Sequence, residues 1–471
     1  MNTTQPLFFP RYFTKKGMLC FALILGICSV IFFQHVLSFQ WIAFGLVQVI
    51  GFFYFANVLT KRWGQLSDVI YQKKLFWVSF GIRGIWVLFS YVYFTQMTGV
   101  PFEFDAGDAP GYYGEARWLH GLLTDGKFDQ YLLYIGTNYG DMGYPIYLAA
   151  LWALFGDSII LPRLVKALLG AFTCVLIYKI GRNNFGEGVG RVAGIFAMLL
   201  PNLIYYCGLH VKETEMVFVV ILFAYFGDKI LRSKKVRLSD FLLLAVLGGL
   251  LFLFRTVLAV CLIASVGVSL FFIAKKVTTA GRRFGLLVLG IVGMIFILSS
   301  PLQKVILKYI DDSDSNLSKQ MANYSKHESN SNKLAQYGTK SIFLPMMLLV
   351  PFPTLVDTDQ PNPMMLGGAF FTRNVYAFFV ILALISLYRQ KIIRAHIFLI
   401  SCLFTYLLML GTTGFALSER FHMPAVPFLL ILAAYGVSQL NYKNKKYYIP
   451  YLIFIGLVVI GWNWFKLAGR A

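Results

Sequence analysis

The chain has 471 residues, of which 58% are hydrophobic and only 13% are charged. A soluble domain has about 25% charged residues, so the composition excludes a soluble enzyme, a disordered chain and a secreted disulfide scaffold. The formal net charge of +21 would suggest a nucleic-acid partner in a soluble protein. Here the basic residues stand in short clusters between apolar runs, as the preference of Lys and Arg for cytoplasmic loops predicts. We therefore expect membrane lipids, and no nucleic acid, as partners.

Long apolar runs predict an all-α polytopic protein with a single integral membrane domain, 1–471, because about 20 consecutive apolar residues cross a bilayer as a helix. A window of about 19 residues gives about thirteen spans. They are expected at 17–37, 39–59, 75–96, 160–180, 189–207, 211–231, 239–254, 256–274, 284–300, 369–388, 395–413, 421–440 and 447–465. The basic clusters between alternate spans then face the cytoplasm, and the remaining loops lie outside the cell membrane.

Two shorter apolar segments, 143–156 and 342–355, are expected to be extracytoplasmic juxtamembrane or re-entrant segments, because neither is long enough or regular enough to span. They fall in two long extracytoplasmic loops. The first loop, 98–159, is acidic in its polar part, whereas the second, 301–368, opens with a Ser/Asn/Lys-rich stretch typical of a mobile lid or linker.

The first loop carries a candidate catalytic carboxylate. After Pro110 the pattern becomes helical, which places Asp108 at or just before the start of a helix, beside the positive end of its dipole. A carboxylate there could take a proton from an attacking hydroxyl. The alternative is that Asp108 is only a helix cap and Asp105 a turn residue.

Several cations are expected at the outer ends of the spans. Lys212 precedes Glu213 at the start of 211–231, where a Lys is unfavourable for the helix dipole, so a phosphate is a natural partner for it. Arg255 lies between two spans, and Arg420 stands at the outer start of 421–440. Arg can hold phosphate oxygens with two parallel hydrogen bonds, although Arg420 could equally pair with Glu419 or reach the headgroups. Acids and cations together on one face suit a lipid-phosphate substrate.

At this point the chain resembles a known family. The run from Asp108 through Tyr112 to Ala116 is similar to the acidic first-loop motif of GT-C glycosyltransferases, in the protein O-mannosyltransferase and lipid A aminoarabinose transferase group. The stretch 143–156 resembles the helix of that family that ends in Phe-Gly, and 418–427 resembles a late Arg-aromatic segment of related polyprenyl-dependent enzymes. The collinear resemblance covers roughly residues 75–231. Two extra spans, compared with that family, precede the motif-bearing loop here, and Gly143-Tyr144-Pro145 replaces the usual Lys-Pro-Pro.

The resemblance implies an inverting glycosyltransferase that moves a sugar from a polyprenyl-phosphate donor to a lipid, glycan or protein acceptor on the extracytoplasmic face. By analogy Asp108 is the catalytic base, and cations stabilise the departing phosphate. The implied substrate-binding residues are Asp105, Tyr112, Glu115, Lys212, Glu213, Arg255 and Arg420. Some relatives use a divalent metal, so a metal is a possible cofactor, but no metal-ligand spacing in the sequence supports one. A bacterial inner membrane is the expected location.

Two other functions fit the same composition. An O-antigen or capsule polymerase or ligase would depend on outer Arg and His residues such as Arg420 and His422, and Asp108 would not matter. A lipid-linked glycan transporter or flippase should place charges near the bilayer midplane and show repeated halves. The predicted spans carry almost no charge at their centres and no repeat is evident, which disfavours the transporter.

Overall fold

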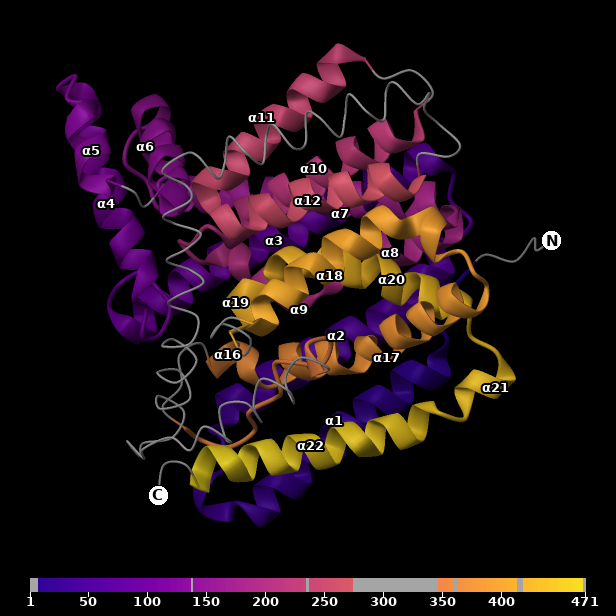
Figure 1. Ribbon diagram of the computed structural model, residues 1–471. Helices are drawn as coiled ribbons and strands as arrows, with labels where there is room; N and C mark the ends of the chain where they lie inside the picture. The colour runs from indigo at the N-terminus through magenta and orange to yellow at the C-terminus, as the bar shows by residue number, and fades with distance from the viewer. Residues whose placement is uncertain are drawn as a thin grey trace.

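The computed structural model describes residues 7–136, 139–233, 237–273, 346–358, 363–412 and 418–468. The predicted span 284–300 and most of the predicted loop 301–368 lie outside these ranges. The described part is a bundle of helices, as the sequence predicted, and its long helices run side by side (Figure 1).

Eight helical stretches in the described ranges are long and apolar enough to cross a membrane. Four are single helices: α1 (Arg11–Ile31), α2 (Phe39–Trp63), α3 (Asp68–Thr98) and α7 (Ile160–Phe185). Four are formed by α17 (Gly368–Arg389), α18 (Ile397–Thr412), α20 (Val426–Ser438) and α22 (Tyr448–Ala468), each with a short helix before it. These short helices are α16 (Pro363–Leu366), η4 (Ile393–His396), α19 (Glu419–His422) followed by η5 (Met423–Ala425), and α21 (Tyr442–Lys445).

A ninth span is formed if the bent pair α8 (Glu187–Leu199) and α9 (Pro201–Tyr205), with η3 (Tyr206–Gly208), is counted as one. The two parts are bent by 54° at Leu200. Pro201 is the first residue of α9, where its missing N–H costs nothing. Arg83 of α3 donates to the carbonyls of Ala197 (3.0 Å) and Met198 (3.4 Å) at the end of α8. The expectation of almost charge-free span centres is thus wrong at Arg83, which is fully buried.

The other helices of the bundle are α10 (Glu213–Arg232), α11 (Leu238–Phe254) and α12 (Thr256–Ile273). They coincide with three predicted spans, but α10 contains several charged residues and α11 has only 17 residues. The described residues therefore show eight or nine candidate spans, and the predicted number of about thirteen is not shown.

Three helices stand together at one end of the bundle: α4 (Asp108–Thr124), α5 (Phe128–Ile135) and α6 (Gly143–Phe155) (Figure 1). Before α6, the short turn η2 (Tyr139–Asp141) packs against α11. A Cβ at Gly143 would lie 2.8 Å from the carbonyl oxygen of Leu253, so only glycine permits this approach. The close approach brings Asp141 to the junction of α11 and α12.

Ion pairs and hydrogen bonds of arginine side chains lie at the other end of the bundle, away from α4. Arg182, in the last turn of α7, binds Asp68 at 2.7 Å, and Arg232, in the last turn of α10, binds Asp228 at 2.9 Å. Arg191 donates to the backbone carbonyls of Trp63 (2.9 Å) and Leu66 after α2. Basic groups near helix C-termini are favourable for the helix dipole.

Candidate active site

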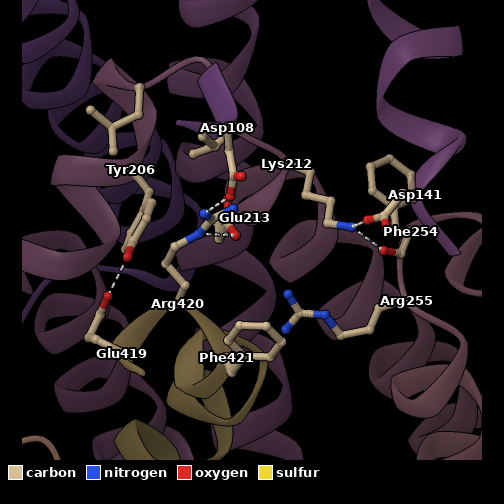
Figure 2. A network of polar contacts seen from close by, with 12 residues as sticks. Asp108, Asp141, Tyr206, Lys212, Glu213, Phe254, Arg255, Glu419, Arg420 and Phe421 are labelled. Atoms are coloured by element: carbon tan, nitrogen blue, oxygen red, sulfur yellow. Dashed lines mark hydrogen bonds and ion pairs between the residues drawn. The ribbon is translucent and has the colours of Figure 1, made fainter. Parts of the chain in front are cut away.

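Arg420 joins two carboxylates that come from distant parts of the chain. Its Nε donates to Glu213 Oε1 at 2.8 Å, and its Nη1 donates to Oδ2 of Asp108 (Figure 2). Asp108 is the first residue of α4, as expected, while Glu213 begins α10 and Arg420 lies in α19. The Glu213 side chain is completely buried, whereas the Asp108 side chain is 55% exposed. Asp108 is therefore the accessible acid of the pair.

Glu419, the residue before Arg420, is held in place by two hydrogen bonds. Its carboxylate accepts hydrogen bonds from Asn202 Nδ2 at 2.6 Å and from the hydroxyl of Tyr206. Both donors belong to the bent element after α8, so the bend at Leu200 places them under α19. Glu419 is buried, and its two hydrogen bonds fix the backbone that carries the guanidinium of Arg420.

Lys212 has a protein partner in place of the expected phosphate. Its Nζ pairs with Asp141 and donates to the carbonyl oxygen of Phe254 at 2.8 Å (Figure 2). The ring of Tyr112 lies 6.0 Å from the same Nζ. The pair with Asp141 accounts for a lysine at the start of α10.

Arg255 lies between α11 and α12 and faces the same region. Its guanidinium stacks over the ring of Phe421 at 4.1 Å, and its Nη1 donates to the Tyr406 hydroxyl at 3.3 Å. Tyr406 in turn donates to the carbonyl oxygen of Phe421 at 2.7 Å, which fixes both groups. Within the ranges that the structure describes, no carboxylate forms an ion pair with Arg255. It is thus the cation best placed to accept an anionic ligand.

Tyr112 lies on α4 beside these groups, and Glu115 lies on the same helix but faces α5. Burial raises the pKa of Tyr112, and the carboxylates of Asp141 and Glu213 raise it further, so it is a hydrogen-bond donor at neutral pH. Glu115 accepts a hydrogen bond from the Tyr131 hydroxyl at 2.8 Å, which ties α4 to α5. Burial raises the pKa of Glu115, although the Tyr131 hydroxyl opposes the shift.

The structure brings six of the eight predicted site residues into one region, but Asp105 and Glu115 face elsewhere. Asp105 lines a separate cavity toward α2, and Glu115 faces α5. Sequence reasoning missed Asp141 and the clamp of Asn202 and Tyr206 on Glu419. Asp141 is one of several acids in the first loop, and nothing in the local spacing links it to Lys212.

Metal ligation has no candidate set in the described part of the chain, where no group of three or more His, Cys, Asp or Glu side chains has suitable geometry. Asp108 and Glu213 are the carboxylates closest to the centre of the site, and Arg420 occupies the space between them. The arrangement offers an exposed carboxylate beside two guanidinium groups and a lysine. It can accept a proton and can bind an anion.

Comparison with known families identifies this part of the molecule. Residues 142–302 match the family described as dolichyl-phosphate-mannose-protein mannosyltransferase. The matched segment contains Lys212, Glu213 and Arg255, whereas Asp108 and Arg420 lie outside it. No curated protein matches the chain. The chain therefore carries a domain of the dolichyl-phosphate-mannose-protein mannosyltransferase family, a GT-C family, and is a multi-pass membrane glycosyltransferase.

Proposed function

We propose that the protein transfers a sugar from a polyprenyl-phosphate donor to a hydroxyl of a lipid, glycan or protein acceptor, with inversion at the anomeric carbon. The family match supports the donor class. The observation that carries the mechanism is the triad of Asp108, Arg420 and Glu213, which puts an exposed carboxylate next to a guanidinium. This combination suits a reaction in which a hydroxyl loses a proton while a phosphate departs.

Asp108 acts as the base. Its Oδ2 is bound to Arg420, whereas its Oδ1 has no hydrogen bond from any described residue, so this oxygen is available to a substrate hydroxyl. The acceptor oxygen attacks the anomeric carbon, and its proton passes to Asp108. The bond from the anomeric carbon to the phosphate oxygen breaks, and its electron pair leaves with the polyprenyl phosphate.

Arg255 and Arg420 stabilise the departing phosphate. Among the described residues, the Arg255 side chain has a phenol and an aromatic ring as partners and no carboxylate, so an incoming phosphate gains a charged hydrogen bond without breaking an ion pair there. Lys212 is held by Asp141, and in this proposal it contributes positive potential rather than direct contact. Tyr112 lies between these groups and donates to the donor sugar or its phosphate.

The site is assigned to the extracytoplasmic side of a bacterial inner membrane. Clusters of Lys and Arg mark the cytoplasmic side of a membrane protein, and the last turns of α2, α7, α10 and α17 carry Lys or Arg. The site lies at the other ends of these helices, beside α4 and α6. About thirteen spans, as the sequence predicts, would place both long loops outside.

The test is transfer of a labelled sugar from a synthetic polyprenyl-phosphate hexose in detergent, with wild type compared with Asp108→Asn. The amide keeps the shape and much of the capping ability of Asp108 but cannot accept the proton. We expect transfer to fall by about 10²–10⁴, with unchanged donor binding and unfolding temperature. Asp129→Asn is the matched control, because Asp129 is an exposed acid in the first turn of α5.

Normal transfer by Asp108→Asn would show that Asp108 is only a helix cap and would refute the proposed base. A polymerase or ligase predicts another pattern, in which Asp108→Asn is active and Arg420→Ala abolishes growth of glycan chains in cells. Absence of sugar transfer by wild type from any polyprenyl-phosphate hexose would overturn the transferase proposal itself.

A further inference from the structure

A cavity of about 350 Å³ is lined in part by Asp105, three residues before the proposed catalytic base, and belongs to none of the contacts described above. Its walls come from three separate segments: the start of α2, the first outer loop, and the chain on either side of 359–362. The lining includes Trp41, Asp105, Thr354, Asp357, Pro363 and Leu366. Ligand pockets in proteins begin at about 300 Å³, so this cavity has room for one sugar ring.

The walls of this cavity are fixed to one another by hydrogen bonds. The Asp357 amide donates to the carbonyl of His35 at 2.8 Å, beside a β-bridge between Val36 and Val356. The Thr354 amide donates to the carbonyl of Leu366 at 2.9 Å. These contacts tie the turn before α2 to the segment before α16. The cavity is therefore formed without a ligand, which reduces the entropy cost of binding.

The chemistry of the lining suits a neutral, hydroxyl-rich ligand. Trp41 offers an indole ring whose orientation is set by edge contact with Phe104 at 5.4 Å. Asp105 and Asp357 are exposed, and neither carboxylate has a side-chain hydrogen bond or ion pair with a described residue. Ionised carboxylates accept several hydrogen bonds from hydroxyls, and an aromatic ring covers the apolar face of a ring-shaped ligand. A membrane phosphate is disfavoured because both charged groups are negative.

The cavity is close enough to Asp108 for one acceptor to reach both. Asp105 precedes Asp108 by three residues, and a fully extended chain covers at most about 11 Å in that distance. Asp105 has a left-handed backbone conformation, with φ of 50°, which is uncommon for a residue other than glycine. The chain therefore turns between the cavity and the first residue of α4.

We propose that this cavity is an acceptor subsite that binds a sugar unit next to the hydroxyl that Asp108 deprotonates. The acceptor is then a glycan, free or lipid-linked, rather than a protein. This proposal rests on the proposed transferase function and narrows its substrate. Asp105 and Asp357 hold the hydroxyls of the sugar, and Trp41 covers its ring.

The test measures transfer from a labelled polyprenyl-phosphate hexose to three acceptor probes: a panel of soluble trisaccharides, the same trisaccharides on a lipid carrier, and a six-residue Ser/Thr peptide. We expect transfer to a saccharide and not to the peptide. Asp105→Asn and Asp357→Asn should each raise the KM for the saccharide about tenfold, the effect of a lost hydrogen bond to a charged group. The kcat and the KM for the donor should change little. Trp41→Phe should have a smaller effect than Trp41→Ala.

A binding measurement separates this proposal from the catalytic one. Carbodiimide with glycine ethyl ester labels exposed carboxylates, and a bound saccharide should protect Asp105 and Asp357 in the full chain while Asp129 stays reactive. Protection should persist in Asp108→Asn, which lacks transfer but keeps the cavity. Soluble and lipid-linked saccharides that protect equally identify the sugar as the recognised part.

Three outcomes overturn the subsite. They are transfer to the peptide alone, unchanged saccharide KM in both Asp→Asn variants, and labelling that the saccharide does not reduce. If Asp108→Asn still abolishes transfer in these cases, the proposed function stands and only the subsite fails. If wild type transfers to no acceptor, both proposals fail together.

Discussion

The two ends of the bundle use ion pairs differently. At the end away from α4, Arg182 joins α7 to Asp68 of α3, and two further pairs, Arg191 with Glu187 and Arg232 with Asp228, are each four residues apart on one helix. At the α4 end, Arg420 meets Asp108, 312 residues away in sequence. The pairs within one helix stabilise it locally. The pairs of Arg420 assemble one site from α4, α10 and α19.

The ends also differ in what they leave available. All three nitrogens of the Arg191 guanidinium donate hydrogen bonds, to Glu187 and to three backbone carbonyls at the end of α2 and just after it. Among the described residues at the α4 end, one oxygen of Asp108 has no partner, and the Arg255 side chain binds a phenol and an aromatic ring but no carboxylate. A cation whose hydrogen-bond donors are already paired contributes to stability, whereas a cation with unpaired donors can bind a substrate. The difference predicts that substitutions at the two ends affect different measurements.

The largest contrast between the ends is expected for Arg420→Met and Arg191→Met. Loss of Arg420 removes a guanidinium from the developing phosphate charge and should lower kcat by about 10²–10³. Loss of Arg191 leaves buried carbonyls unpaired and should lower the free energy of unfolding by about 1–3 kcal/mol, with little change in kcat per folded molecule. Transfer rates and thermal unfolding in detergent measure both. Equal loss of kcat in both variants would remove the distinction.

Arg255 provides the next test. Arg255→Lys keeps the charge but loses the planar stack on Phe421 and the two-pronged contact with phosphate. We expect the KM for the polyprenyl-phosphate donor to rise about tenfold in Arg255→Lys and more in Arg255→Met. Tyr406→Phe, which removes only the hydroxyl contact to Arg255, should have a smaller effect. A donor KM that is the same in all three would argue against phosphate binding by Arg255.

A smaller effect on kcat is expected from substitutions of the two residues that donate hydrogen bonds to Glu419. Tyr206→Phe removes one of the two donors to Glu419, and Asn202→Leu removes the other. Because Glu419 only positions Arg420, each change should lower kcat by about tenfold and leave the donor KM nearly unchanged, as expected when a catalytic group is slightly misplaced. Steady-state kinetics separate the two parameters. A rise in KM without loss of kcat would indicate that Glu419 contributes to binding instead.

The smallest expected effect is a pH dependence of the local stability of α4. Burial raises the pKa of Glu115, so the folded state favours its protonated form. Its stabilising contribution is present below the ordinary carboxyl pKa of about 4.3 and is lost as the pH rises through the raised value. Hydrogen exchange of α4 and α5 amides should therefore increase in wild type relative to Glu115→Gln across that range. A constant difference between the two at all pH values would contradict this assignment.

The sequence predicted the helices better than the contacts between them. Each span expected in the described ranges falls on a helix, for example 160–180 on α7, because long apolar runs report local structure directly. The number of spans was less secure, since α10 combines charges with an apolar face and α8 is interrupted at Leu200. Hydropathy does not distinguish such a break from a continuous span.

The site shows the same division. The helical pattern after Pro110 correctly placed Asp108 at the start of α4. The pairing of Asp108 with Arg420 could not be predicted, because no periodic signal connects residues so distant in sequence. The unfavourable position of Lys212 at a helix start predicts an anionic partner, but it does not identify Asp141 as that partner. Asp141 lies 71 residues away and reaches Lys212 only through the close approach at Gly143.

The contact of Arg83 with the end of α8 has a mechanical consequence. A helix interrupted by proline usually acts as a hinge, because the carbonyls near the break lose their partners. Here a buried guanidinium takes two of those carbonyls, so straightening the 54° elbow would strand a cation in an apolar interior. The bend at Leu200 is therefore a rigid part of the bundle rather than a hinge.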